Sequence, residues 1–116
     1  MIKNGSAVRN ISAKIWDDKI KKAKDYIKKA VDDYCVSNPG KPFSVRILFG
    51  GINKDWRGTA LQPIFYYYDN LKLDYDIAAN RAAKDVVWLL KAVLYDDKEH
   101  TYEEINGRTK SYIRIK

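Results

Sequence analysis

The sequence predicts a small α+β fold, in which two helices pack on a small mixed sheet within a single domain that spans residues 1–116. Two long segments place apolar residues at helical spacing, one short segment alternates apolar with polar residues, and an Asn-Gly pair near the end of the chain suits a hairpin. With 116 residues, of which 46% are apolar, the chain is long enough to bury a modest core. Its single cysteine, Cys35, excludes an internal disulfide bond.

The first predicted helix runs from Lys14 to Tyr34, after a polar segment in which Ser12 is a candidate N-cap. Lysines lie off its apolar stripe, so we expect an amphipathic helix with a basic outer face. The segment SNPGKP at residues 37–42 contains two prolines and a glycine, and the helix is expected to stop there. The stripe consists of Trp16, Ile20, Ala23, Ile27, Ala30, Val31 and Tyr34.

The middle of the chain predicts strand and loop. Residues 43–49, FSVRILF, alternate apolar with other side chains and are followed by two glycines, which is typical of a half-buried strand. Residues 52–63 show no periodicity and are expected to form a loop. The run IFYYY at residues 64–68 is either a second strand or a ledge of aromatic side chains.

The second predicted helix covers residues 77–94 and provides the core of the fold. The pair Asn106-Gly107 then favours a tight type I′ turn between two short closing strands. The apolar stripe of this helix consists of Ala79, Ala82, Ala83, Val86, Leu89, Leu90 and Val93. The opposite, polar side consists of Arg81, Lys84, Asp85, Trp88 and Lys91.

Positive charge is concentrated in the first part of the chain. The net charge is +7, and residues 1–50 hold 11 Lys and Arg against 5 Asp and Glu, whereas residues 51–116 hold 11 against 10. Such a basic field attracts phosphate backbones without regard to their sequence. The alternative is that the lysines only solubilise an amphipathic helix.

The compartment follows from what the chain lacks. The N-terminus MIKNGSAVRN does not resemble a signal peptide, and no run of about 18 apolar residues is present. We therefore expect a cytoplasmic protein with no membrane as a partner.

Aspartates at both ends of the second helix are the main candidates for chemistry. In an extended segment residues i and i+2 point to the same side, so Asp74 and Asp76 are expected to converge. Carboxylates suit Mg²⁺ or Mn²⁺, and a metal-activated water cleaves phosphodiesters. The alternative is that both acids only favour the helix N-terminus. Asp96 and Asp97 lie where the helix dipole disfavours negative charge, which supports a metal site.

Other side chains carry weaker signals. His100, the single histidine, has no serine or cysteine at a related spacing, so no catalytic triad is expected. Stacking on unpaired bases, core packing and a subunit interface all suit an aromatic group that consists of Trp56, Tyr66, Tyr67 and Tyr68.

The order of motifs resembles the RusA-type Holliday-junction resolvases, which are small phage-borne endonucleases. That family has a lysine-bearing helix, a strand, a loop, a D-x-D-N motif that opens a helix, then L-x-D-D and closing strands. This chain presents SAKIWDDKIKKAKDYIKKAV, KPFSVRILF, LDYDIAANRAAKDVVWLLKAV, LYDDKEH and SYIRIK in the same order. In the family the asparagine directly follows the second aspartate, whereas three residues separate Asp76 from Asn80 here. The segment DYDIAANRAAK also resembles, less closely, the third motif of RuvC-type nucleases.

The resemblance to the resolvases implies a Mg²⁺-dependent endonuclease that cleaves branched DNA as a homodimer, in the cytoplasm of a bacterial host or a phage-infected cell. It implies that Asp74, Asp76 and Asp97 bind the metal, with Asp96 beside them, and that Lys84 contacts the scissile phosphate. Candidates for contacts to the DNA backbone are Lys21, Lys24, Lys28, Lys41, Arg46 and Arg81.

Two alternatives belong to other classes of protein. The displaced asparagine favours a catalytically inactive nucleic-acid-binding protein, or a phage accessory or inhibitor protein. The third hypothesis is a protein-interaction module in which the tyrosines and Trp88 form the interface.

Overall fold

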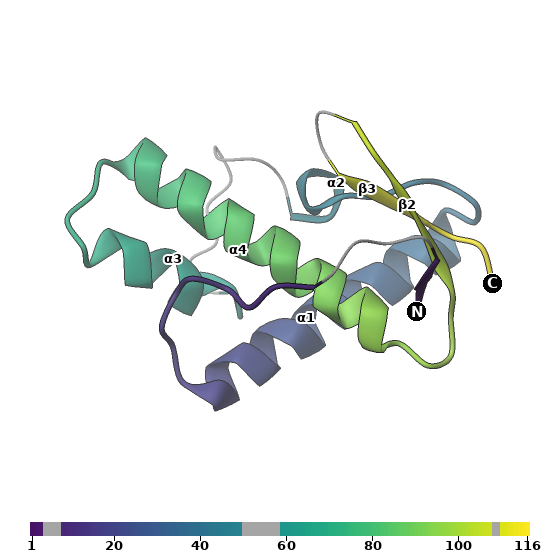
Figure 1. Ribbon diagram of the computed structural model, residues 1–116, viewed down its shortest axis with the longest axis horizontal. Coiled ribbons are helices and arrows are strands. Elements are labelled where there is room, and N and C mark those ends of the chain that lie inside the picture. The colour runs from purple at the N-terminus through teal and green to yellow at the C-terminus, as the bar shows by residue number, and fades with distance from the viewer. Residues whose placement is uncertain (4–7, 50–58, 108–109) are drawn as a thin grey trace.

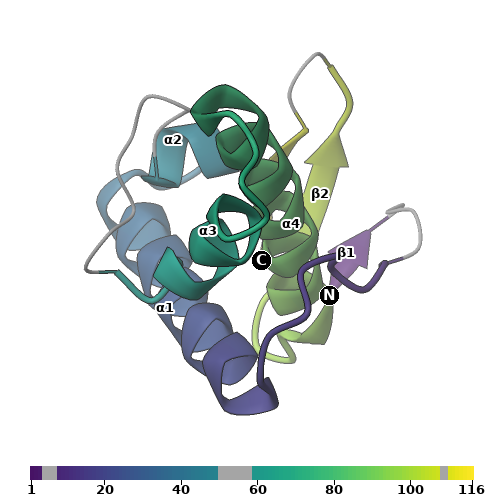
Figure 2. The ribbon, with the colours of Figure 1, turned by 90° about the vertical axis from the view of Figure 1, so that its left-hand side faces the viewer.

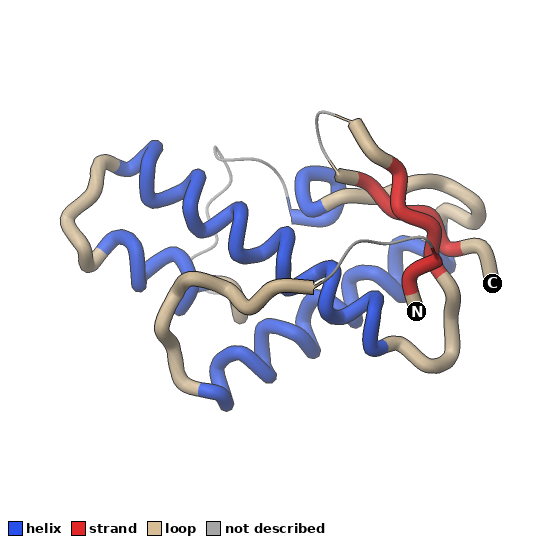
Figure 3. Tube along the Cα trace, viewed as in Figure 1, coloured by secondary structure: helices blue, strands red, loops and turns tan. Residues whose placement is uncertain are grey.

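In the computed structural model, helices pack around one another and against a small sheet in an α+β arrangement, which confirms the predicted fold class (Figures 1 and 3). The structure describes residues 1–3, 8–49, 59–107 and 110–116. Within these residues four helices and three strands are present, so two further helices join the predicted pair. In chain order the elements are β1 (Ile2–Lys3), α1 (Asp17–Ser37), α2 (Val45–Phe49), α3 (Gln62–Asp69), α4 (Tyr75–Asp96), β2 (Tyr102–Ile105) and β3 (Ser111–Arg114).

Helix α4 is the centre of the molecule. Helices α1, α2 and α3 all pack against it, and its buried face is the broad apolar stripe expected from the sequence. Figure 2 shows α1 and α2 on one side of α4 and strands β1 and β2 on the other. At one end of the molecule α3 and α4 form a helical hairpin, and the sheet lies at the opposite end (Figure 1). The two ends of α4 are therefore in different surroundings.

Helix α1 begins at Asp17, three residues after the predicted start, and Trp16 is its N-cap residue. Trp16 is 80% exposed, so it does not belong to the buried stripe of this helix. Ser12 is not the cap, because it lies four residues before the N-cap position, and its N–H group donates to the carboxylate of Asp85. The predicted stop is confirmed: α1 ends at Ser37, and Gly40 has the positive φ angle of 72° that a turn requires.

The sheet is mixed, as predicted. Strand β1 pairs in parallel with β2, and β2 pairs antiparallel with β3. Tyr102 and Tyr112 occupy the buried face of β2 and β3, and both are fully covered. The closing hairpin is confirmed, but the predicted two-residue turn is wrong, because the last strand pair, Ile105 with Ser111, leaves residues 106–110 as the connection.

The predicted strand over residues 43–49 is wrong in most of its length. Only Phe43 forms a β-bridge, to Tyr112, and residues Val45–Phe49 form α2. The Ser44 hydroxyl accepts a hydrogen bond from the Ile47 N–H, which starts the helical turn. Because Val45 and Phe49 are both buried one turn apart, packing against α4 and α1 overrides the alternating pattern.

The IFYYY run is also helical, because it lies within α3. Pro63 stands at the start of this helix, where its missing N–H costs nothing. Ile64 and Tyr68, one turn apart, are buried against α4. The run is therefore neither the strand nor the ledge that the sequence suggested.

The predicted helix at 77–94 is confirmed and extends from Tyr75 to Asp96. Two residues assigned to its polar side are nevertheless buried, namely Asp85 at 3% exposed and Lys91 at 1%. The carboxylate of Asp85 accepts hydrogen bonds from the N–H groups of Ser12 and Ala13 and from the Tyr68 hydroxyl. Lys91 forms an ion pair with Glu104 at 3.2 Å. Burial of both groups is tolerated because each has polar partners.

Within the described part of the chain, every helix is too short or too polar to cross a lipid bilayer. Gly50, Gly51, Trp56 and most of the predicted loop at 52–63 lie outside the described residues.

Candidate functional site

The structure does not bring the predicted metal ligands together. Asp74 is the N-cap residue of α4, and Asp76 lies in the first turn of this helix, so the two do not belong to one extended segment. Asp96 is the last residue of α4 and Asp97 is its C-cap. The 22 residues of α4 span about 33 Å at a rise of about 1.5 Å per residue. Within one chain, the two pairs of aspartates therefore cannot bind the same metal ion.

Asp97 has a structural reason to stand at a helix C-terminus. Its Oδ1 accepts the N–H groups of Glu99 and His100 at 2.9 and 3.2 Å, which turns the chain away from α4. Its Oδ2 accepts the Tyr102 hydroxyl at 2.7 Å and lies 3.4 Å from the Lys28 ammonium. These four donors offset the unfavourable interaction between the Asp97 carboxylate and the helix dipole. They explain why an acid stands at this position, which the sequence alone does not.

Asp97 is one member of a closed ring of polar contacts, which we call the ion-pair ring. Lys28 bridges Asp97 and Asp32, and Asp32 accepts from Arg114. Arg114 in turn donates to the Tyr102 hydroxyl at 2.7 Å, and Tyr102 donates back to Asp97. The ring joins α1, the end of α4, β2 and β3, and its two cations balance its two anions. It therefore links the sheet to the helices without a net buried charge.

The ion-pair ring keeps both of its carboxylates ionised. Burial alone would raise the pKa of Asp97, but the hydrogen bond from Tyr102, the N–H groups of Glu99 and His100, and the charge of Lys28 lower it to about 2. Burial likewise opposes the ionisation of Asp32, yet Lys28 and Arg114 hold the pKa of its carboxyl below the ordinary value. Burial and the Asp97 carboxylate raise the pKa of Tyr102, so its hydroxyl remains a donor.

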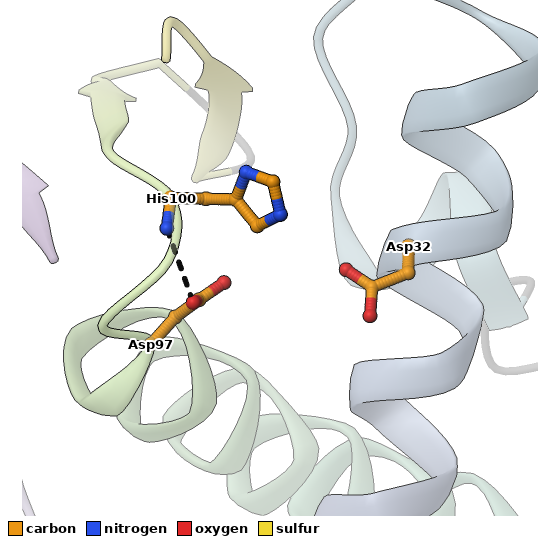
Figure 4. A group of neighbouring side chains, drawn as sticks. All are labelled: Asp32, Asp97 and His100. Atoms are coloured by element: carbon orange, nitrogen blue, oxygen red, sulfur yellow. Dashed lines mark hydrogen bonds between the residues drawn. The ribbon is translucent and has the colours of Figure 1, made fainter.

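One group of potential metal ligands lies at this ring. Figure 4 shows His100 and Asp97 on one side and Asp32, from α1, on the other, and their ligand atoms all lie within 4.8 Å of one another. A divalent cation here would have to displace Lys28 and Arg114, which already neutralise both carboxylates. Moreover, the buried Nε of Arg114, which has no hydrogen-bond partner among the described residues, is a donor that repels a metal ion. The residues of the ring therefore fit Mg²⁺ poorly.

The cations predicted to contact DNA fall into two groups. Lys28 belongs to the ion-pair ring, and Lys21 forms an exposed ion pair with Asp25 at 2.9 Å. The outer face of α1 is thus less basic than predicted, because its lysines alternate with aspartates one turn away. No ion pair within the described parts of the chain involves the remaining candidates, Lys24, Lys41, Arg46 and Arg81, or the proposed phosphate contact Lys84.

A cleft of about 530 Å³ lies between the N-terminal segment, α1 and α4. We call it the Trp88–Tyr95 cleft after its two aromatic residues, which both come from α4. Arg9 on the N-terminal segment and Lys24 on α1 add positive charge to its lining. Trp88 is half-buried, and the guanidinium of Arg9 lies 5.4 Å from the centre of its ring.

The aromatic residues of the interaction hypothesis, as far as the structure describes them, lie in different parts of the molecule. Tyr66 and Tyr75 are exposed at the α3–α4 hairpin, at the end of the molecule opposite the sheet, whereas Tyr68 is buried. Trp88 follows Tyr75 by more than three turns of α4 and lies in the cleft. The protein-interaction hypothesis, which joined the tyrosines to Trp88, stays a prediction.

Sequence reasoning missed most of the residues that now define these sites. Asp32 and Arg114 carry no motif, and the only local signal is the spacing of Lys28 and Asp32, four residues apart on a helix. Arg9 and Tyr95 likewise belong to no sequence motif. The spacing of Trp88, Ala92 and Tyr95 along α4 was a usable signal, because it places two large rings on one face with a small residue between them.

Comparison of the chain with protein-family models, with curated proteins and with solved structures gives no match. The resemblance to RusA-type resolvases therefore stays a hypothesis. The same holds for Mg²⁺, branched DNA and the homodimer, which that resemblance implied.

Proposed function

We propose that the protein binds nucleic acid without cleaving it. The proposal rests on one observation: the aspartates are separated or engaged in structural contacts, whereas several cations are exposed and outside ion pairs among the described residues. The aspartates that a nuclease would need lie at opposite ends of α4, and Asp97 is occupied by four donors. The chain nevertheless keeps a net charge of +7, and several exposed cations form no ion pair with another residue that the structure describes.

Exposed positive charge that could contact a polyanion is found in the N-terminal segment. Residues 1–16 contain Lys3, Arg9 and Lys14 but no acidic residue, and all three cations are exposed. Two further exposed cations, Lys41 and Arg46, lie just before α2 and within it. Contacts of this kind neutralise phosphates and give affinity without base specificity.

Endonuclease activity is the competing proposal, and it needs a geometry that one chain does not supply. Asp74 and Asp76 are exposed and are free to meet a cation, but they offer two carboxylates without Asp97. Lys84 lies within α4 and is exposed, as a phosphate contact would have to be. A homodimer that joined the two ends of α4 would restore the predicted set of ligands, so cleavage has to be measured directly.

The experiment uses the full chain with a labelled four-way junction, a duplex and a single strand. Binding is followed by fluorescence anisotropy at about 50 mM salt and again at about 200 mM, and cleavage on denaturing gels with Mg²⁺, Mn²⁺ or EDTA. We expect binding in EDTA and in Mg²⁺ alike, with affinity that falls steeply with salt, and no cut strand.

The outcomes separate the proposals. Absence of binding to all three substrates at the lower salt concentration would refute nucleic-acid binding. Metal-dependent cleavage that Asp76→Asn abolishes would replace the proposal with the endonuclease. An exposed variant of matched charge change, Asp69→Asn, is the control, because Asp69 lies outside every site considered for metal.

A further inference from the structure

The Trp88–Tyr95 cleft has features that phosphate contacts do not explain. Its volume of about 530 Å³ falls in the usual range for small-ligand sites. On α4, Trp88, Ala92 and Tyr95 lie at positions i, i+4 and i+7, so they share one face of the helix. The small side chain of Ala92 leaves a recess between the two rings. The opposite wall is formed by Ile20 of α1 and by the N-terminal segment.

Tyr95 is the ring with an open face. It is 58% exposed, and no other ring within the described residues contacts it. Trp88, in contrast, is covered by two cations, because Arg9 and Lys91 lie 5.4 and 5.6 Å from its ring centre. A planar group that enters the cleft would therefore stack on Tyr95, while Trp88 forms the inner wall.

Hydrogen bonds to α4 hold the N-terminal segment, which forms one wall of the cleft, in place. The N–H groups of Ser12 and Ala13 both donate to Asp85 at 3.0 Å, and Asp85 is buried in α4. This pair of bonds fixes the N-terminal segment across α4, next to Arg9. The recess is therefore formed before a ligand arrives, which lowers the entropic cost of binding.

The polar groups of the lining suit a base more than a phosphate. Arg9 and Lys24 are donors, and Asp17 and Asp96 are acceptors, so the charged groups of the lining balance. A neutral heteroaromatic ring with amino and carbonyl groups on its edge matches this mixture, whereas a free anion would meet two carboxylates. The phosphates attached to such a ring would remain outside the cleft, near the exposed Arg9.

We propose that the Trp88–Tyr95 cleft holds one unpaired nucleobase of a single-stranded nucleic acid, stacked on Tyr95. This inference rests on the proposed function and adds a substrate class to it. A base within a duplex is paired and stacked, so it cannot enter without being flipped out. Single strands are therefore bound more tightly than duplexes, and only they reach the cleft.

Trp88 supplies the readout. The double variant Trp16→Phe/Trp56→Phe leaves Trp88 as the only tryptophan, since the chain has three. A single strand of about 12 nucleotides is titrated into this variant, with the duplex of the same sequence as the comparison. We expect the single strand, but not the duplex, to change the Trp88 emission as it binds.

Two pairs of variants test the geometry. Tyr95→Ala should weaken single-strand binding on the order of 10-fold and leave duplex binding unchanged. Tyr75→Ala is its matched control, because Tyr75 is also an exposed tyrosine of α4, 53% exposed, but lies at the other end. Lys24→Gln should weaken single-strand binding more than Lys22→Gln does, since both remove one charge from α1 but only Lys24 lines the cleft.

The failure of this inference is distinct from the failure of nucleic-acid binding. If labelled single strands bind by anisotropy, yet Trp88 emission stays constant and Tyr95→Ala behaves like Tyr75→Ala, the cleft proposal is overturned and the proposed function stands. If neither single strand nor duplex binds, both are overturned. Equal changes of Trp88 emission with single strand and duplex would also overturn the selection for unpaired bases.

Discussion

Asp74 and Asp97 are the N-cap and the C-cap of the same helix, so the whole length of α4 separates the two carboxylates. Their surroundings differ as much as their positions. Asp74 is exposed and its side chain makes no capping hydrogen bond, whereas Asp97 is buried and accepts hydrogen bonds from two backbone N–H groups and from Tyr102. Two aspartates that the sequence assigns to one site therefore have different roles, and the difference is measurable.

Equal charge changes at the two ends of α4 should have unequal effects on stability. In Asp97→Asn the amide group would face the Tyr102 hydroxyl and the Lys28 ammonium, so a donor would meet donors in a buried place. We expect a loss of about 2–4 kcal/mol in the free energy of unfolding. Asp76→Asn, in the exposed first turn, should cost at most about 1 kcal/mol. Urea denaturation of the two variants measures both values, and equal losses would contradict the assignment of Asp97 as a structural acceptor.

Stability should fall in acid in a way that depends on Asp97. Its pKa is lowered from 3.8 in the unfolded chain to about 2 in the fold, so its contribution is complete above about pH 5 and is lost as the pH falls through 2. A difference of this size corresponds to about 2 kcal/mol. Urea midpoints taken from neutral pH to about pH 2 should converge for wild type and Asp97→Asn. A constant gap between the two proteins over this range would show that the charge of Asp97 contributes nothing.

The ion pair between Asp32 and Arg114 should couple more strongly than an exposed pair on the same helix. Arg114 is 15% exposed, and its guanidinium also donates to Tyr102 and lies 5.3 Å from the centre of that ring. We expect a double-mutant cycle of Asp32→Asn with Arg114→Met to give a coupling energy on the order of 1 kcal/mol, limited by the solvent that reaches Asp32.

The matched cycle uses Lys21 and Asp25, both of which are well exposed. Its coupling energy should not exceed about 0.5 kcal/mol, because water and salt screen the pair. The two cycles are compared at low and at high salt. A coupling for Asp32 and Arg114 that vanished at high salt would mean that the ring contributes no more than an ordinary surface pair.

Asp85 should hold the N-terminal segment in place. Asp85→Asn replaces one acceptor oxygen by an amino group, so in a buried site either the Ser12 N–H loses its acceptor, or the Ala13 N–H and the Tyr68 hydroxyl both lose theirs. We expect a loss of about 2–3 kcal/mol in the free energy of unfolding. Amide hydrogen exchange at residues 12 and 13 should become faster in this variant, because the segment detaches from α4 before the fold is lost.

Tyr68→Phe serves as the control for Asp85. It removes one donor to the carboxylate but leaves the bonds from the Ser12 and Ala13 N–H groups intact. Exchange at residues 12 and 13 should therefore remain slow although the protein is destabilised by about 1 kcal/mol. Fast exchange in both variants would indicate that general loss of stability, and not the Asp85 contacts, frees the segment.

Local periodicity was sufficient for the two long helices, because each has an apolar stripe that no alternative structure buries as well. Periodicity was not sufficient where the same residues fit both the period of a strand and the period of a helix. Residues 45–49 suit a strand by alternation and a helix by the i, i+4 pair Val45 and Phe49, and the partner surface on α4 decided for the helix. The length of the predicted helix at 77–94, about 27 Å, was by itself enough to separate Asp76 from Asp97.

The sequence by itself determined the α+β class, the two long helices, the stop after α1, the closing hairpin and the positive charge. These features depend on spacing and composition, which are local. Only the tertiary structure decided what the buried polar groups do. Asp85 lies 72 residues from Ala13 along the chain, and Arg114 lies 82 residues from Asp32. Hydrogen bonds over such distances leave no period in the sequence, so the partners of Asp97, Asp85 and Arg114 became visible only when the chain was folded.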